Sequence, residues 1–241
     1  MQQQFVNCCE LDTRLPGHYN VAPWRRWLTK ICPPGIKVLP VLHQNWLNAA
    51  FIEEGIRITG SKTDFLFVIE TEQTCRLPQN PTPEQLRQLP GNSIVGAYEA
   101  KTSSFILKKG TLGLAPQVAV QALALNWMSR TRRGKYFIPV FGGDFNDHVV
   151  LHAAPTADGF ELHAATSSDG DDPQLAPRYM QYLLLRTKAC AEAASQGEGL
   201  HTAVTRLQHH VIRVLVSLCL ATYSLYQISA EQPNLQHNVR Q

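Results

Sequence analysis

The stretch SIVGAYEAKTSS, Ser93–Ser104, decides the fold that we expect for this chain. Its first part, Ser93–Ala97, is apolar and contains β-branched residues, which is typical of a buried β-strand. Glu99 and Lys101 follow two positions apart, so their side chains lie on the same face of the strand. Burying a charged pair costs free energy unless something compensates for it. Two compensations remain open: a salt bridge at the strand end, or a bound metal ion.

Length and composition are those of a globular protein. The chain has 241 residues, 44% of them hydrophobic and 17% charged, which is enough for one large domain or a domain with an appendage. A net charge of +3 is too small to indicate nucleic-acid binding by itself. The six cysteines show no zinc-ligand spacing and the N-terminus shows no secretory pattern. We therefore expect reduced thiols and an intracellular protein, cytoplasmic or nuclear.

Hydrophobic periodicity and turn residues predict alternating helices and strands. The predicted helices cover 24–31, 40–54, 84–88, 116–129, 177–194 and 200–227. The predicted strands cover 56–59, 64–69, 93–100, 136–141, 149–153 and 160–164. This order predicts an α/β core with a mixed sheet flanked by helices over residues 36–166. An N-terminal arm, 1–35, precedes it, and an α-helical C-terminal extension, 167–241, follows.

The segment 200–227 has two interpretations. The uncharged stretch Val214–Ala230, which overlaps its second half, is at the short limit for a transmembrane helix. However, its apolar residues recur every three or four positions, and polar residues such as Ser217 and Gln227 interrupt the run. We therefore expect a packed helix and no membrane span, and its apolar stripe allows a homodimer through this helix.

A second carboxylate, Asp64, begins the strand that precedes the Glu99 strand. If the two strands are neighbours, Asp64, Glu99 and Lys101 converge at one edge of the sheet. Two carboxylates beside an ammonium group suit a hard divalent cation, because Mg²⁺ prefers oxygen ligands and is usually held by one or two carboxylates and substrate phosphates. The cation can lower the pKa of a bound water, and a lysine can orient that water.

Asp64 in SKTDFLFVIE and Glu99-Ala100-Lys101 resemble the motif of the PD-(D/E)XK nuclease superfamily, which has the restriction-endonuclease-like fold. The resemblance covers about Leu39 to Leu162. It implies a metal-dependent nuclease that hydrolyses phosphodiester bonds of DNA or RNA with Mg²⁺ or Mn²⁺. Thr63 replaces the motif proline, and a proline-rich insertion at 71–92 lengthens the gap before Glu99.

The resemblance also implies supporting site residues. A glutamine often lies on the helix that follows the motif, and here Gln117 and Gln121 share one helix face. A glutamate on the first helix often completes the metal shell, so Glu54, or its neighbour Glu53, joins Asp64 and Glu99 as a candidate ligand. Ordinary roles remain open for all of these residues: a turn, an exposed ion pair, or a polar helix face.

A compact basic cluster follows that helix and comprises Arg130, Arg132, Arg133 and Lys135. It either favours the helix dipole at a solvated helix end or contacts nucleic-acid phosphates without sequence preference. Two further functions remain open beside a metal-dependent nuclease that acts on DNA or RNA. One is a non-catalytic module that binds nucleic acid or protein on the same fold. The other is a nuclease effector or toxin.

Overall fold

A computed structural model describes most of the chain between Val21 and Ser195. The described residues are 21–41, 46–51, 56–61, 63–90, 92–131, 136–156, 159–167 and 174–195. The predicted helix at 200–227 therefore lies outside them, as do Glu53 and Glu54. Within these ranges, no helix is long and apolar enough to cross a membrane.

A six-stranded mixed sheet forms the centre of the described structure, in the order β1-β4-β5-β6-β7-β8. The strands are β1 (Ile36–Pro40), β4 (Phe65–Ile69), β5 (Ile94–Ala100), β6 (Val140–Gly143), β7 (His148–Thr156) and β8 (Gly159–Ser167). Neighbouring strands are antiparallel except for β5 and β6, which are parallel. A parallel pair needs a crossover connection, and helix α6 (Ala115–Thr131) lies in it. The predicted α/β class with a mixed sheet is confirmed.

A separate two-stranded sheet consists of β2 (Leu47–Phe51) and β3 (Ile56–Ser61). The helix predicted over 40–54 is therefore wrong, because its centre is a strand. A short apolar run fits a helix and a buried strand equally well, and pairing with the isoleucine-rich β3 decides between them. The strand predicted at 56–59 is confirmed, but it lies in this small sheet. One of the two edge strands of the main sheet is β1, which the sequence did not predict.

Most predicted helices are confirmed with small shifts at their ends. They are α2 (Val21–Ile31), α4 (Pro83–Arg87), α6 and α7 (Leu175–Ser195). Three short helical segments were not predicted: α3 (Glu72–Cys75), α5 (Ser103–Lys109) and the 3₁₀ helix η1 (Thr111–Leu114). In α5 the Thr102 hydroxyl accepts a hydrogen bond from Phe105 N at 3.3 Å, and Gly110 ends the helix with a φ of 69°.

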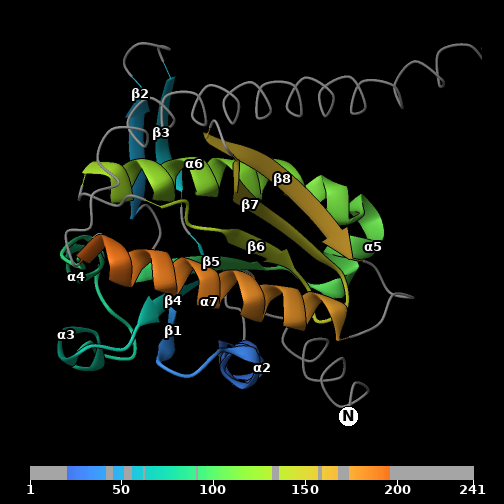
Figure 1. The fold of residues 1–241 in the computed structure, drawn as a ribbon. Coiled ribbons are helices and arrows are strands. Elements are labelled where there is room, and N and C mark those ends of the chain that lie inside the picture. The colour runs from blue at the N-terminus through green and yellow to red at the C-terminus, as the bar shows by residue number, and fades with distance from the viewer. Residues whose placement is uncertain are drawn as a thin grey trace, which may run out of the picture.

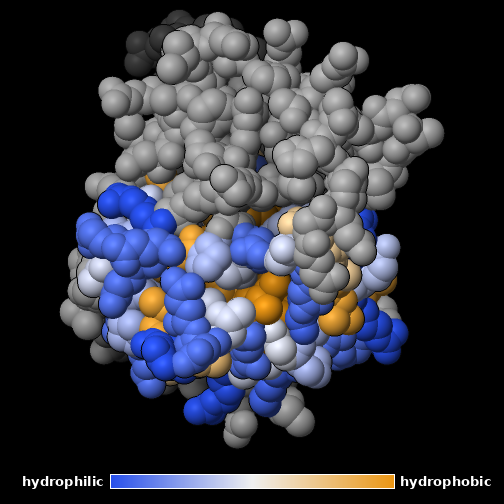
Figure 2. Space-filling model, turned by 60° about the vertical axis from the view of Figure 1, so that its left-hand side comes forward, coloured by the Kyte–Doolittle hydropathy of each residue, from blue (hydrophilic) through white to orange (hydrophobic). Residues whose placement is uncertain are grey.

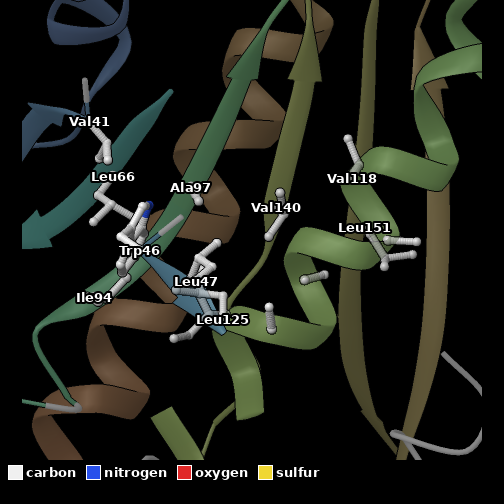
Figure 3. Packing of buried hydrophobic residues seen from close by; sticks show 14 of the residues in the cluster. Val41, Trp46, Leu47, Leu66, Ile94, Ala97, Val118, Leu125, Val140 and Leu151 are labelled. Atoms are coloured by element: carbon white, nitrogen blue, oxygen red, sulfur yellow. The ribbon is translucent and has the colours of Figure 1, made fainter. Parts of the chain in front are cut away.

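Strand alternation divides the core between the two faces of the main sheet, with α6 and α7 on opposite sides (Figure 1). Leu66 of β4 and Ala97 of β5 belong to a cluster that α6 covers. Trp46 and Leu47, both fully buried, belong to the same cluster, and Figure 3 shows them near Leu125 of α6. This cluster also surrounds the face of β5 to which Glu99 belongs.

The other face carries a second cluster, in which Phe67 and Tyr98 pack against side chains of α2 and α7. Both helices lie outside the range 36–166 expected for the core, and both contribute buried side chains, such as Trp24 and Leu184. The coloured part of the surface in Figure 2 is mainly hydrophilic, with smaller hydrophobic areas between the polar residues, as is usual for a globular protein.

Gly142 allows the start of α6 to approach the sheet. A Cβ atom at this position would lie 2.7 Å from Val118 Cγ2 and 2.9 Å from Leu114 Cδ2, closer than real Cβ contacts. Gly142 is also the register partner of Glu99 across the parallel β5–β6 pair. The glycine therefore brings the first turns of α6 close to Glu99.

Candidate active site

Glu99 occupies the end of a strand that is buried at every position. Its residue exposure is 3%, and it points to the same side as Ala97, toward α6. A carboxylate at this depth requires hydrogen-bond donors or an opposite charge nearby. The surrounding residues supply both.

Lys101 provides the opposite charge. Its Nζ atom lies 2.7 Å from Glu99 Oε1, and the two side chains are 12% and 3% exposed. The same Nζ lies 5.4 Å from the ring centroid of Phe105 in α5, within cation–π range. The spacing of two residues on one strand face predicted this pair correctly.

Helix α6 supplies two amide donors to the same carboxylate. Gln117 Nε2 donates to Glu99 Oε1 at 2.6 Å, and Gln121 Nε2 donates to Glu99 Oε2 at 2.6 Å. Because the glutamines are four residues apart, they project from one side of the helix. Gln117 reaches the site from the surface, whereas Gln121 is only 1% exposed. The structure thus brings both predicted glutamines to Glu99.

Asp64 lies directly before β4 and reaches the same edge. Its Oδ2 atom accepts a hydrogen bond from Ala100 N at 2.9 Å. Its own backbone continues the sheet ladder, because Asp64 N donates to Tyr98 O at 3.1 Å and Asp64 O accepts from Val41 N at 2.8 Å. The neighbouring pair Phe65 and Tyr98 are in register, so the antiparallel pairing of β4 with β5 places Asp64 beside Glu99.

Burial raises the pKa of the Glu99 carboxyl, and the nearby charge of Asp64 raises it further. Lys101, through its charge and its hydrogen bond, and Gln121, through its hydrogen bond, act in the opposite direction. The raised pKa means that the surroundings as a whole still disfavour the negative charge. Two carboxylates beside one ammonium group leave a deficit of positive charge that a cation can supply.

The oxygen-rich donor set fits a hard divalent cation. Within the described ranges, no group of three or more His, Cys, Asp and Glu side chains converges as a metal site. A zinc site of three or four protein ligands is therefore not formed by these residues. Mg²⁺ or Mn²⁺ would be held by Asp64 and Glu99, with water and substrate oxygens as the remaining ligands.

Other predicted site residues cannot be placed. Glu54, Arg132, Arg133 and Lys135 lie outside the described residues, and Arg130 is placed only as part of the backbone of α6. Glu54 was expected at the end of a helix over 40–54, but the centre of this segment is strand β2.

Sequence reasoning missed two groups near the site. The backbone N–H of Ala100 holds the Asp64 carboxylate, and no sequence signal marks a backbone donor. On the opposite sheet face, the Tyr98 hydroxyl donates to Asp144 O at 3.1 Å and lies 3.2 Å from His148 Nδ1. Burial lowers the pKa of His148 to about 4, so its ring is neutral at pH 7.

Comparison of the chain with protein-family models, with curated proteins and with solved structures found no match. The residues of the candidate site come from three parts of the chain: the residue before β4, the end of β5 with the residue after it, and the first half of α6.

Proposed function

We propose that this chain is a metal-dependent nuclease, a hydrolase of phosphodiester bonds in DNA or RNA, on a restriction-endonuclease-like fold of the PD-(D/E)XK type. One observation carries the proposal. Asp64 at the start of β4, and Glu99 and Lys101 at the end of β5, lie together at one end of this pair of strands. This arrangement supports a PD-(D/E)XK-type site. The strand–helix–strand order of β5, α6 and β6 is compatible with that fold.

Each residue has a role that follows from its position. Asp64 and Glu99 supply the carboxylates for Mg²⁺ or Mn²⁺. When bound, such a cation polarises the substrate phosphate and lowers the pKa of a coordinated water. Lys101, whose ammonium group adjoins Glu99, offsets charge on the phosphate and orients the attacking water. Gln117 and Gln121 fix the orientation of the Glu99 carboxylate.

The hydrogen bonds to Glu99 also favour an alternative, a non-catalytic binding module on the same fold. Lys101, Gln117 and Gln121 together supply donors to both carboxylate oxygens, so the charge is compensated without a cation. In such a module these residues would stabilise the fold and would not take part in a reaction. The nuclease and the binding module therefore differ in one respect: only the nuclease has a cleavage rate that divalent cations support and that substitutions at the site lower.

A cleavage assay with labelled single- and double-stranded DNA and RNA tests the proposal. Wild-type protein should cut at least one substrate with Mg²⁺ or Mn²⁺, and EDTA should abolish cutting. Asp64→Asn, Glu99→Gln and Lys101→Met should each lower the rate on the order of 100-fold or more, since each removes an electrostatic or acid–base contribution. Glu72→Gln is the matched control, because that carboxylate is 80% exposed in a surface pair with Arg76.

Three outcomes would contradict the proposal: cutting that survives EDTA, full rates in the three site variants, or an equal loss of rate in Glu72→Gln. The absence of cutting on all four substrates, together with salt-dependent binding to one of them, would favour the binding module. Circular dichroism of every variant separates lost chemistry from lost folding.

A further inference from the structure

We infer that a pocket between α7 and the β7–β8 hairpin binds a small, uncharged aromatic molecule that carries one hydrogen-bonding group. The pocket is lined by residues at the start of α7 and the end of β8, on the opposite face of the sheet from Glu99. Figure 1 shows the positions of these two elements. None of Asp64, Glu99, Lys101, Gln117 and Gln121 lines the pocket. The inference therefore does not depend on the proposed nuclease activity.

Hydrophobic side chains form most of the pocket wall. Phe141 comes from β6, Val150 from β7 and Ala165 from β8, while Leu175 and Met180 come from α7. Phe141 and Met180 are almost fully buried, so this part of the wall belongs to the core and is preformed. An apolar ligand would gain hydrophobic contact here without first reorganising the protein.

The volume of the pocket limits the size of the ligand. It measures about 180 Å³. Apolar cavities of about 150 Å³ in proteins accept benzene. The present pocket thus has room for one aromatic ring with one or two additional heavy atoms. The rings of Phe141 and Tyr179 and the sulfur of Met180 line the space and favour an aromatic ligand over an aliphatic one.

The described pocket wall offers no charged side chain to an ionic ligand. None of the described side chains that line the pocket is Asp, Glu, Lys or Arg. His148 also lines it, and this ring is 6% exposed and neutral at pH 7. A charged ligand would lose its hydration here without gaining an ion pair, which is unfavourable. The ligand class is therefore neutral.

One polar atom indicates where the hydrogen-bonding group of the ligand would lie. The hydroxyl oxygen of Ser167, at the end of β8, is buried and has no hydrogen-bond partner among the described residues. Ser167 lines the pocket. A buried polar atom without a partner carries a cost in free energy. The oxygen is covered where it lies, so rotation of the Ser167 side chain toward the pocket would let a ligand hydroxyl or carbonyl group supply the missing hydrogen bond. Water fits less well, because it needs two to four polar partners.

Thermal unfolding of the full chain with phenol and benzene as probes tests the inference. Phenol at about ten times its dissociation constant should raise Tm by about 3–6 °C for a domain of this size. Benzene should give a smaller rise, because it offers no hydrogen bond to Ser167. Ser167→Ala should remove the advantage of phenol over benzene, whereas Ser104→Ala, on the exposed side of α5, should not.

Filling the pocket provides the second test. Ala165→Leu should remove the rise in Tm with both probes. Ala176→Leu, at the half-buried start of α7, should have the same effect and serves as the test if Ala165→Leu does not fold. Titration calorimetry of the folded variants should give the same order of affinities. A wild-type Tm that does not change with phenol would overturn the inference. The inference would also be overturned if phenol raised the Tm of both filled variants as much as it raises that of the wild type. Equal responses to phenol and benzene would overturn the role of Ser167.

Discussion

Replacing Lys101 with methionine should lower the free energy of unfolding by about 3–5 kcal/mol at pH 7, the usual cost of removing one partner from a buried ion pair. Methionine has a similar length, so the change removes the charge with little loss of packing. Glu99 would remain 3% exposed beside Asp64, with only amide donors to compensate it.

The distance between the two charges supports this magnitude. At 2.7 Å, the attraction of two unit charges is about 6 kcal/mol with an effective dielectric constant of about 20. Lys101 regains some hydration in the unfolded chain, and its side chain is 12% exposed in the folded one, so the net loss is smaller than the full attraction. A loss of about 3–5 kcal/mol is a large part of the stability of a typical domain.

The effect should depend on pH with a definite sign. Burial and Asp64 already raise the pKa of Glu99 in the folded state, and removing Lys101 raises it further. A carboxyl group with a raised pKa destabilises the fold only while it is ionised. The difference between variant and wild type is therefore largest near neutral pH, decreases as pH falls through the folded pKa values, and vanishes below the unfolded value of about 4.5.

Divalent cations should reduce the same difference. If Asp64 and Glu99 hold a cation, Mg²⁺ replaces the missing positive charge, and the variant should gain more stability from 10 mM Mg²⁺ than the wild type does. Urea unfolding at pH 7 and pH 4, with Mg²⁺ and with EDTA, measures both effects. Lys108→Met is the matched control, because Lys108 is an exposed lysine in the last turn of α5.

Unchanged stability in Lys101→Met at pH 7 would refute the description of Glu99 as a buried carboxylate that depends on this lysine. A loss of the same size at pH 4 would show that packing, and not charge, is responsible. A loss at pH 7 that Mg²⁺ does not reduce would leave the ion pair as a structural feature and would count against the metal site.

Three further predictions concern the surroundings of the site. Gly142→Ala should lower the unfolding free energy in urea by about 1–3 kcal/mol, because its Cβ would lie 2.7 Å from Val118 Cγ2; an unchanged value would show that α6 moves without cost. Gln121→Leu should cost about 1–3 kcal/mol, because it removes the donor 2.6 Å from Glu99 Oε2, and an unchanged stability would show that this hydrogen bond is dispensable. His148 has a folded pKa of about 4 against 6.5 when unfolded, so stability is lost as pH falls through this window. His148→Gln should therefore reduce the loss of stability between pH 6.5 and pH 4 by up to about 3 kcal/mol, and an identical pH profile would contradict the lowered pKa.

Local patterns in the sequence predicted much of the candidate site. The strand before Glu99, the spacing of Glu99 and Lys101, and the helix that carries Gln117 and Gln121 all follow from periodicity within one segment. The β7–β8 hairpin and α7 followed in the same way. These features depend on residues that are close in sequence, so a single sequence contains the relevant information.

Pairing between distant segments required the tertiary structure. The sequence could not show that β4 pairs with β5 and thereby places Asp64 beside Glu99, nor that Ala100 N holds the Asp64 carboxylate. The close approach of α6 to the sheet likewise depends on Gly142, which has no Cβ atom to contact Val118.

The wrong and missed elements have the same origin. The apolar residues within 40–54 have the spacing of a helix. In the structure this segment forms strand β2, because it pairs with β3 and packs against α6. The segment Ile36–Pro40, which follows the prolines of the N-terminal arm, showed no strand pattern of its own, and its pairing with β4 makes it the strand β1. A short segment gains most of its stability from the partner that buries it, so its structure is decided by the partner and not by its own residues.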